Sequence, residues 1–245
     1  MSPFGRSFSE GDRLEVAGAF VTLKVNRRAR RVSLRLDRTR REIVATAPSP
    51  RRLSEAAAFA RERAGWIAER IAELPEAQPI QPGMTLQVFG EPVRLEPGSG
   101  RARWHPAADG EPARITAMGE GEGYARAVTL VLKRRALAVL SERTETYAAM
   151  LGAPMPTVSV ADARGRWGSC RPGVRGGAPA IRYSWRLALA PFAVADYVAA
   201  HECAHLKELN HGPRFWAHVQ ALVGDPRAHR AWLRAEGARL HAFGR

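Results

Sequence analysis

The segment 191–216 constrains the fold most, because it favours a helix that carries two histidines and then ends in a sharp turn. It opens with a proline and contains an apolar stripe, both of which are typical of an amphipathic helix. His201 and His205 are four residues apart, so on a helix their imidazoles share one face, a single turn apart. A Gly-Pro pair interrupts helix formation shortly afterwards, and we expect the helix to end at Asn210.

Two imidazoles at this spacing can bind one metal ion, although a pair of solvated histidines is the competing interpretation. His211 follows the expected end of the helix, and a turning chain can bring it back as a third ligand. Three protein ligands leave one tetrahedral position open for water, as in catalytic zinc sites. Glu202 lies beside the histidine pair, where a carboxylate can take a proton from the zinc-bound water. The sequence therefore predicts Zn²⁺ bound by His201, His205 and His211, with Glu202 as the catalytic general base.

The third ligand has alternatives further along the chain. The interval from His205 to His211 equals that of the pattern HExxHxxGxxH, but Glu208 stands where that pattern has its glycine. A solvated helix face is the favoured interpretation for each alternative ligand. These alternatives are His218, Asp225, His229, Glu236 and His241. Cys203 comes two positions after His201 and so turns away from the metal face, which favours a place in the core.

Three runs of residues resemble the YgjP-like family of metallopeptidases, which is related to the SprT and WLM-type zinc peptidases. The runs are GRWGSC at 165–170, SWRLALAP at 184–191 and DYVAAHECAHLKELNHGPRFW at 196–216. The resemblance implies a zincin-like domain in which His201, His205 and His211 bind zinc and Glu202 is the catalytic acid/base. Zinc peptidases of this kind use a strand before the metal helix as an edge that pairs with an extended substrate, which implies a peptide or protein substrate.

The hydrophobic pattern predicts an α+β fold with a β-rich N-terminal region, 1–122, and a metal-binding catalytic domain, 123–245. In the first region, one helix is expected at 54–74 and a flexible boundary at 98–123. Strands are expected at 20–25, 32–36 and 43–46 as an antiparallel meander, and at 86–89, 93–95 and 114–116. In the second region, a long amphipathic helix is expected at 125–151. The residues expected to face inward on it are Val128, Leu132, Leu137, Leu140, Tyr147 and Leu151. Strands at 157–160 and 180–187 flank a GRWGSC loop, and two helices follow at 213–222 and 226–240.

Composition limits the setting of this domain. No long apolar run approaches the length of a membrane span and the N-terminus lacks an apolar signal core, so we expect a cytoplasmic protein without a membrane partner. The two cysteines are expected to be free thiols. The formal net charge is +14, which suits a nucleotide or nucleic-acid partner. Only three of the 38 basic residues are lysines, so a solvated, arginine-rich surface is the competing interpretation.

Three functions follow from these features. The first is a zinc-dependent metallopeptidase, because the HExxH segment follows a potential edge strand. The second is a metal-dependent nucleotide phosphohydrolase of the nucleoside triphosphate pyrophosphatase type, since the same activated water can attack phosphorus. The third is a nucleic-acid-associated protein whose arginine side chains bind the nucleic acid. Arg166 could hold a substrate carboxylate or phosphate near the metal, and a surface loop position is its alternative.

Overall fold

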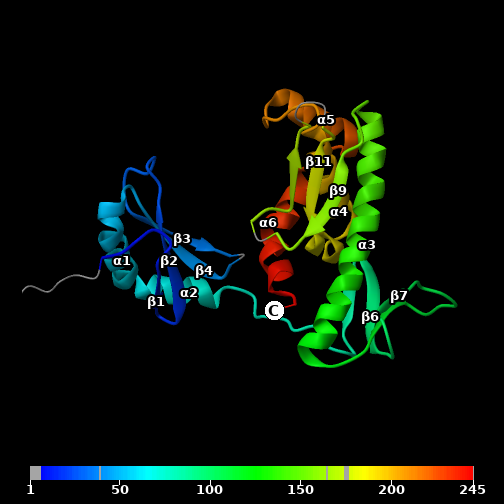
Figure 1. Ribbon diagram of the computed structural model, residues 1–245, viewed down its shortest axis with the longest axis horizontal. Coiled ribbons are helices and arrows are strands. Elements are labelled where there is room, and N and C mark those ends of the chain that lie inside the picture. Colours follow the sequence, from blue (N-terminus) through cyan, green and yellow to red (C-terminus); the bar gives the residue numbers. More distant parts are fainter. Residues whose placement is uncertain (1–6, 39, 164, 174–176, 245) are drawn as a thin grey trace, which may run out of the picture. The chain divides into compact units, whose positions relative to one another are not determined.

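Groups of consecutive strands are followed by helices along the chain in the computed structural model, which describes residues 7–38, 40–163, 165–173 and 177–244 (Figure 1). The chain divides into unit 1, Met1–Glu76, and unit 2, Ala77–Arg245. Each unit has its own hydrophobic core. The mixed α+β class predicted from the sequence is thereby confirmed. The predicted boundary at 122/123 lies within unit 2, so the predicted β-rich region 1–122 includes unit 1 and the first part of unit 2.

Unit 1 contains a four-stranded sheet in the order β1-β2-β4-β3. Its strands are β1 (Arg13–Val16), β2 (Ala19–Val25), β3 (Ser33–Asp37) and β4 (Glu42–Ala47). The prediction of an antiparallel meander was wrong for this sheet, because β2 pairs with β4 in parallel. The burial of the strands explains the order. β4 is almost entirely buried and lies in the middle, whereas β3 alternates exposed and half-buried residues, as an edge strand does.

Two helices and a short 3₁₀ turn follow this sheet, where a single helix at 54–74 was predicted. They are η1 (Pro50–Arg52), α1 (Leu53–Glu62) and α2 (Ala64–Ala72). The interruption lies at Arg63, close to Gly65, a residue with low helix propensity. Backbone hydrogen bonds still bridge it, because the Arg63 N–H donates to the Phe59 carbonyl and the Ile67 N–H to the Arg63 carbonyl. The change is therefore a local kink, and both helices bury residues in the unit 1 core.

Unit 2 begins with a second four-stranded sheet in the order β5-β6-β8-β7. Its strands are β5 (Thr85–Val88), β6 (Glu91–Pro97), β7 (Arg103–His105) and β8 (Ala113–Ala117). The predicted strands at 86–89, 93–95 and 114–116 correspond to three of these. The segment 98–123, predicted as a flexible boundary, contains β7 and β8, which pair with each other, and β8 also pairs with β6.

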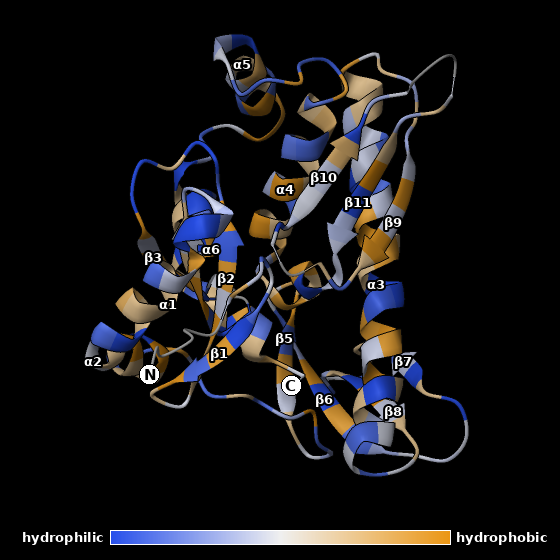
Figure 2. Cartoon of the chain, turned by 60° about the vertical axis from the view of Figure 1, so that its left-hand side comes forward, coloured by the Kyte–Doolittle hydropathy of each residue, from blue (hydrophilic) through white to orange (hydrophobic). Residues whose placement is uncertain are grey.

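A long helix, α3 (Gly121–Met150), crosses unit 2 and confirms the helix predicted at 125–151. Hydrophobic and hydrophilic segments alternate along it in Figure 2, as expected for a helix with one buried face. Val128, Leu132, Leu140 and Tyr147 are buried, as predicted. Leu137 was also predicted to face inward but is exposed.

The third sheet has the order β10-β11-β9 and lies beside α3 and α4 (Figures 1 and 2). Its strands are β9 (Thr157–Ala161), β10 (Gly168–Arg171) and β11 (Ala180–Ser184), and a 3₁₀ segment, η2 (Trp185–Leu189), follows. β11 pairs with β9 in parallel and with β10 in antiparallel orientation. The GRWGSC run was predicted as a loop, but its second half is β10. In the described part of the chain, β10 has β11 as its only strand neighbour and leaves one edge free.

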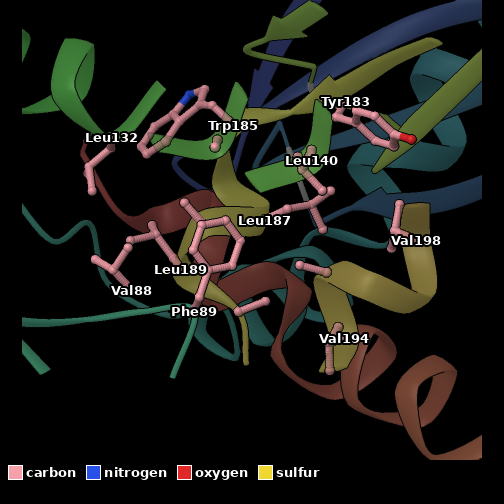
Figure 3. Close-up of a cluster of buried hydrophobic side chains, with 14 of the residues drawn as sticks. Val88, Phe89, Leu132, Leu140, Tyr183, Trp185, Leu187, Leu189, Val194 and Val198 are labelled. Atoms are coloured by element: carbon pink, nitrogen blue, oxygen red, sulfur yellow. The ribbon is translucent and has the colours of Figure 1, made fainter. Parts of the chain in front are cut away.

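Three helices complete unit 2: α4 (Phe192–Ala204), α5 (Pro213–Val223) and α6 (Arg227–Ala242). The core between them, α3 and the sheets includes Trp185, Leu187 and Val198, which belong to the cluster of buried side chains drawn in Figure 3. Burying each such large side chain contributes about 1.5–3 kcal/mol. The two ends of unit 2 are also joined. The Gln78 N–H donates to the Ala242 carbonyl over 3.1 Å and the Gly244 N–H donates to the Gln78 carbonyl over 2.8 Å.

None of the described helices combines the length and the apolar character that crossing a membrane requires.

Candidate metal centre

The last turn of α4 carries two of the four residues predicted to form the site. His201 and Glu202 lie within the helix, and His205 is the residue that follows its end at Ala204. The helix is therefore shorter than predicted, since it was expected to continue to Asn210. The carbonyl of Ala204 accepts hydrogen bonds from the N–H groups of both Lys207 and Glu208, so the chain tightens into turns there.

These turns bring His211 back towards α4. The His211 Nε2 lies 3.1 Å from the His201 Nε2. One ligand atom from each of His201, His205 and His211 lies within 4.8 Å of the other two. Two nitrogens bound to one tetrahedral zinc ion at 2.0–2.1 Å are about 3.3 Å apart. A hydrogen bond between two neutral imidazoles would give a similar separation, but the convergence of three rings also fits a shared ion.

Neighbouring groups orient two of the imidazoles through their Nδ1 atoms. The Tyr197 hydroxyl lies 3.4 Å from the His201 Nδ1, and the carbonyl of Glu208 lies 3.0 Å from the His205 Nδ1. Both rings are thus left with Nε2 as the atom available to a metal. The ring of Phe215, which is buried in α5, packs 4.5–4.8 Å from all three histidine rings, measured between centroids.

The surroundings favour neutral imidazoles, which is the form that binds metal. The pKa of His201 is lowered to about 4, mainly by burial and in addition by the neighbouring His205, His211 and Arg230. Burial also lowers the pKa of His205. The donor set is three imidazole nitrogens on a partly exposed surface, which fits a transition metal such as zinc.

Glu202 is buried, and the backbone of β10 covers it. A Cβ atom placed on Gly168 would lie 2.5 Å from both Cγ and Oε1 of Glu202, closer than real atoms approach. Burial raises the pKa of Glu202 to about 7, against the opposing effects of Arg166 and of a hydrogen bond to the backbone of Cys170. The carboxyl group therefore sits against the edge strand, where it can both accept and release a proton near neutral pH.

The alternative ligands lie elsewhere. Among the described residues, no other histidine, cysteine or acidic side chain joins the three-histidine cluster. His229 stacks on Tyr197 and His241 stacks on Trp167, with ring centroids 5.8 and 4.8 Å apart. Cys203 is fully buried, as predicted, and both cysteines are free thiols.

Sequence reasoning missed two features of this site, the strand β10 and the close approach of Gly168 to Glu202. The one signal for them was the pair of small residues Gly168 and Ser169, which follows Trp167. Glycine often marks a close approach of the backbone to another group.

Comparison with known families gave a match. The model of the family described as "YgjP-like, metallopeptidase domain" matches residues 30–236, a range that begins in unit 1 and extends into α6. Searches of curated proteins and of solved structures gave no match. Because the family model covers most of the sequence, the chain belongs to the YgjP-like metallopeptidase family and is by that membership a metallopeptidase-type hydrolase.

Proposed function

We propose that the protein is a zinc-dependent peptidase in which His201, His205 and His211 hold the metal and Glu202 is the general base. The observation that carries the proposal is the position of Glu202, next to the three-histidine cluster in sequence and against the free edge of β10 in space. When bound, a zinc ion would lower the pKa of a coordinated water and polarise the substrate carbonyl.

Other residues of the chain orient the histidines and transfer the proton. Tyr197 and the backbone of Glu208 orient the imidazoles of His201 and His205, which leaves their Nε2 atoms available to hold a metal. Glu202 takes a proton from the attacking water and returns it to the leaving amine, a role that suits a carboxyl whose pKa burial raises to about 7.

The edge strand supports a peptide as substrate. β10 pairs only with β11 in the described part of the chain, so no other strand occupies its outer edge, and an extended peptide can pair there with the backbone groups that the contact between Glu202 and Cys170 leaves available. Glu202 meets β10 at Gly168 and Cys170. A peptide paired along this edge would therefore run past the general base, and main-chain pairing would tolerate many sequences.

The variant Glu202→Gln tests the proposal. We expect its peptide hydrolysis, measured on a mixed peptide library by mass spectrometry, to fall by about 10²–10⁴-fold, because the amide cannot accept a proton. Its zinc content should stay that of the parent. Glu145→Gln, which changes an exposed carboxylate on α3, is the matched control and should cleave normally. Cleavage by Glu202→Gln at the parent's rate would contradict the role of Glu202.

A further inference from the structure

A pocket of about 330 Å³ lies on the outer face of the β10-β11-β9 sheet, and we call it the arginine pocket. It is lined by Ser159, Arg166, Ser169, Cys170, Arg171, Ala180, Ile181 and Arg182. The strand register places Ser159, Ser169 and Arg182 on the same face of the sheet, because Ser169 is opposite Arg182 and Arg182 is opposite Ser159. Ile181 and Tyr183, which alternate with Arg182, are buried on the other face of β11.

The charged side chains that line the arginine pocket are all positive. Three exposed guanidinium groups line it, from Arg166, Arg171 and Arg182. No acidic side chain lines the pocket, and none of the three arginines forms an ion pair with any residue that the structure describes. Like charges gathered in a hollow repel one another and attract anions. Hydroxyl groups of Ser159 and Ser169 add hydrogen-bond donors.

The arginine pocket adjoins the candidate site in two ways. Arg166 is close enough to Glu202 for its charge to lower the pKa of that carboxyl. Ser169 and Arg171 belong to β10, the strand that covers Glu202. A peptide paired with the free edge of β10 would place every second side chain on the sheet face that carries Ser169, Arg171 and Arg182.

We propose that the arginine pocket selects acidic peptide substrates, by binding aspartate or glutamate side chains of a strand paired with β10. This inference rests on the proposed function, since it assumes that a peptide occupies the edge. Arginine suits the role because its planar guanidinium binds a carboxylate through two parallel hydrogen bonds. The preference should affect the residues that flank the cleaved bond at alternate positions.

The test compares two fluorescent peptides that differ only at alternate positions, glutamate in one and glutamine in the other. Binding is measured by fluorescence anisotropy on the zinc-loaded full chain carrying Glu202→Gln. We expect about tenfold tighter binding of the acidic peptide at low salt, the effect of two or three exposed ion pairs. The ratio of the two Kd values should decrease as salt is added.

Arginine variants in the same background locate the preference. Arg171→Gln combined with Arg182→Gln should bring the ratio of Kd values close to one. Arg94→Gln removes an exposed arginine of β6 that lies outside the pocket, and it should keep the tenfold ratio. Thermal unfolding of each variant checks that the fold is retained. Equal or absent binding of the two peptides, or an unchanged ratio in the double variant, would overturn the proposal.

Two further measurements separate this inference from the proposed function. If the parent hydrolyses no peptide but the arginine-dependent preference is found, the proposed function fails and the preference of the arginine pocket for acidic peptides stands. If the parent cleaves peptides without the preference, the proposed function stands and this inference fails.

A nucleoside triphosphate serves as a competitor in the binding measurement. Tighter, arginine-dependent binding of the triphosphate than of the acidic peptide would assign the pocket to polyphosphates and overturn a peptide side chain as its ligand.

Discussion

Because Gly168 has no side chain, the carboxyl group of Glu202 can lie directly against the backbone of β10. The Cβ of an alanine at position 168 would lie 2.5 Å from the Glu202 side chain, so the carboxyl group would have to move. We expect Gly168→Ala to reduce kcat/KM for peptide hydrolysis by roughly one to two orders of magnitude, because proton transfer depends on position within about 1 Å. Zinc content, measured by elemental analysis, should stay at the parent's level, since the histidines are untouched.

Gly165→Ala is the matched control for this prediction. It lies three residues earlier on the same segment, and a Cβ placed there has nothing within 4 Å. Its kcat/KM should equal that of the parent. Normal hydrolysis by Gly168→Ala would show that Glu202 is free to move without loss, and would argue against a fixed general base.

Proximity in sequence decided which site residues could be predicted. His201, Glu202, His205 and His211 lie within one helical turn and the loop after it, so their convergence follows from local geometry. Gly168 approaches Glu202 only because β10 packs on α4, and Arg182 shares the arginine pocket with residues of β10 only because β10 pairs with β11. Nothing local fixes that pairing, and these two residues could not be assigned to the site from the sequence.

At the scale of elements, an ionic contact joins α4 to α3 one to two turns before the histidines. The Arg143 Nε donates to the Asp196 Oδ1 over 2.6 Å, and the Tyr147 hydroxyl donates to the Asp196 Oδ2 over 2.8 Å. The side chain of Asp196 is only 17% exposed, so its charge is largely shielded from water. This contact fixes the helix that carries the histidines against the longest helix of unit 2.

We expect Asp196→Asn to lower the free energy of unfolding by about 1–3 kcal/mol, because a partly buried guanidinium loses its charged partner. Chemical denaturation of the metal-free protein measures the change. Glu122→Gln on the first turn of α3 removes the exposed contact with Arg126 and should have little effect, since such surface pairs stabilise weakly. Equal effects of the two substitutions would mean that the α3–α4 contact is no stronger than a surface pair.

Elements with a long, regular period were predictable, and strand partners were not. The buried residues of α3 recur at helical spacing over many turns, which fixes its existence. The order β1-β2-β4-β3 depends instead on which strand is the most buried, and a meander would have matched the same local pattern. β10 was missed because the residues Gly168–Arg171 lack an alternation of apolar and polar side chains.

At the scale of the whole molecule, the chain consists of two units whose connection is exposed. Glu76 and Ala77 are exposed and belong to no helix or strand, and each unit has a separate core. We expect a glutamate-specific protease at low concentration to cut first after Glu76, because cleavage requires extended, accessible backbone. Mass spectrometry of the fragments identifies the cut.

The larger fragment should still bind zinc, because all three histidines of the cluster lie in unit 2. In the variant Glu76→Gln this first cut should disappear while the parent's other cuts remain. Initial cleavage inside unit 2, or loss of zinc from the 77–245 fragment, would contradict the division into two separately folded units.

The hydrogen bonds between Gln78 and the segment 242–244 hold the first and last residues of unit 2 next to each other. A short linker could therefore join residue 244 to residue 78, and new termini could be opened in the exposed bend at 99–101. Such a circular permutant would keep every strand pairing and the histidine cluster. The architecture of unit 2 thus depends on which segments touch and not on the order in which a ribosome delivers them.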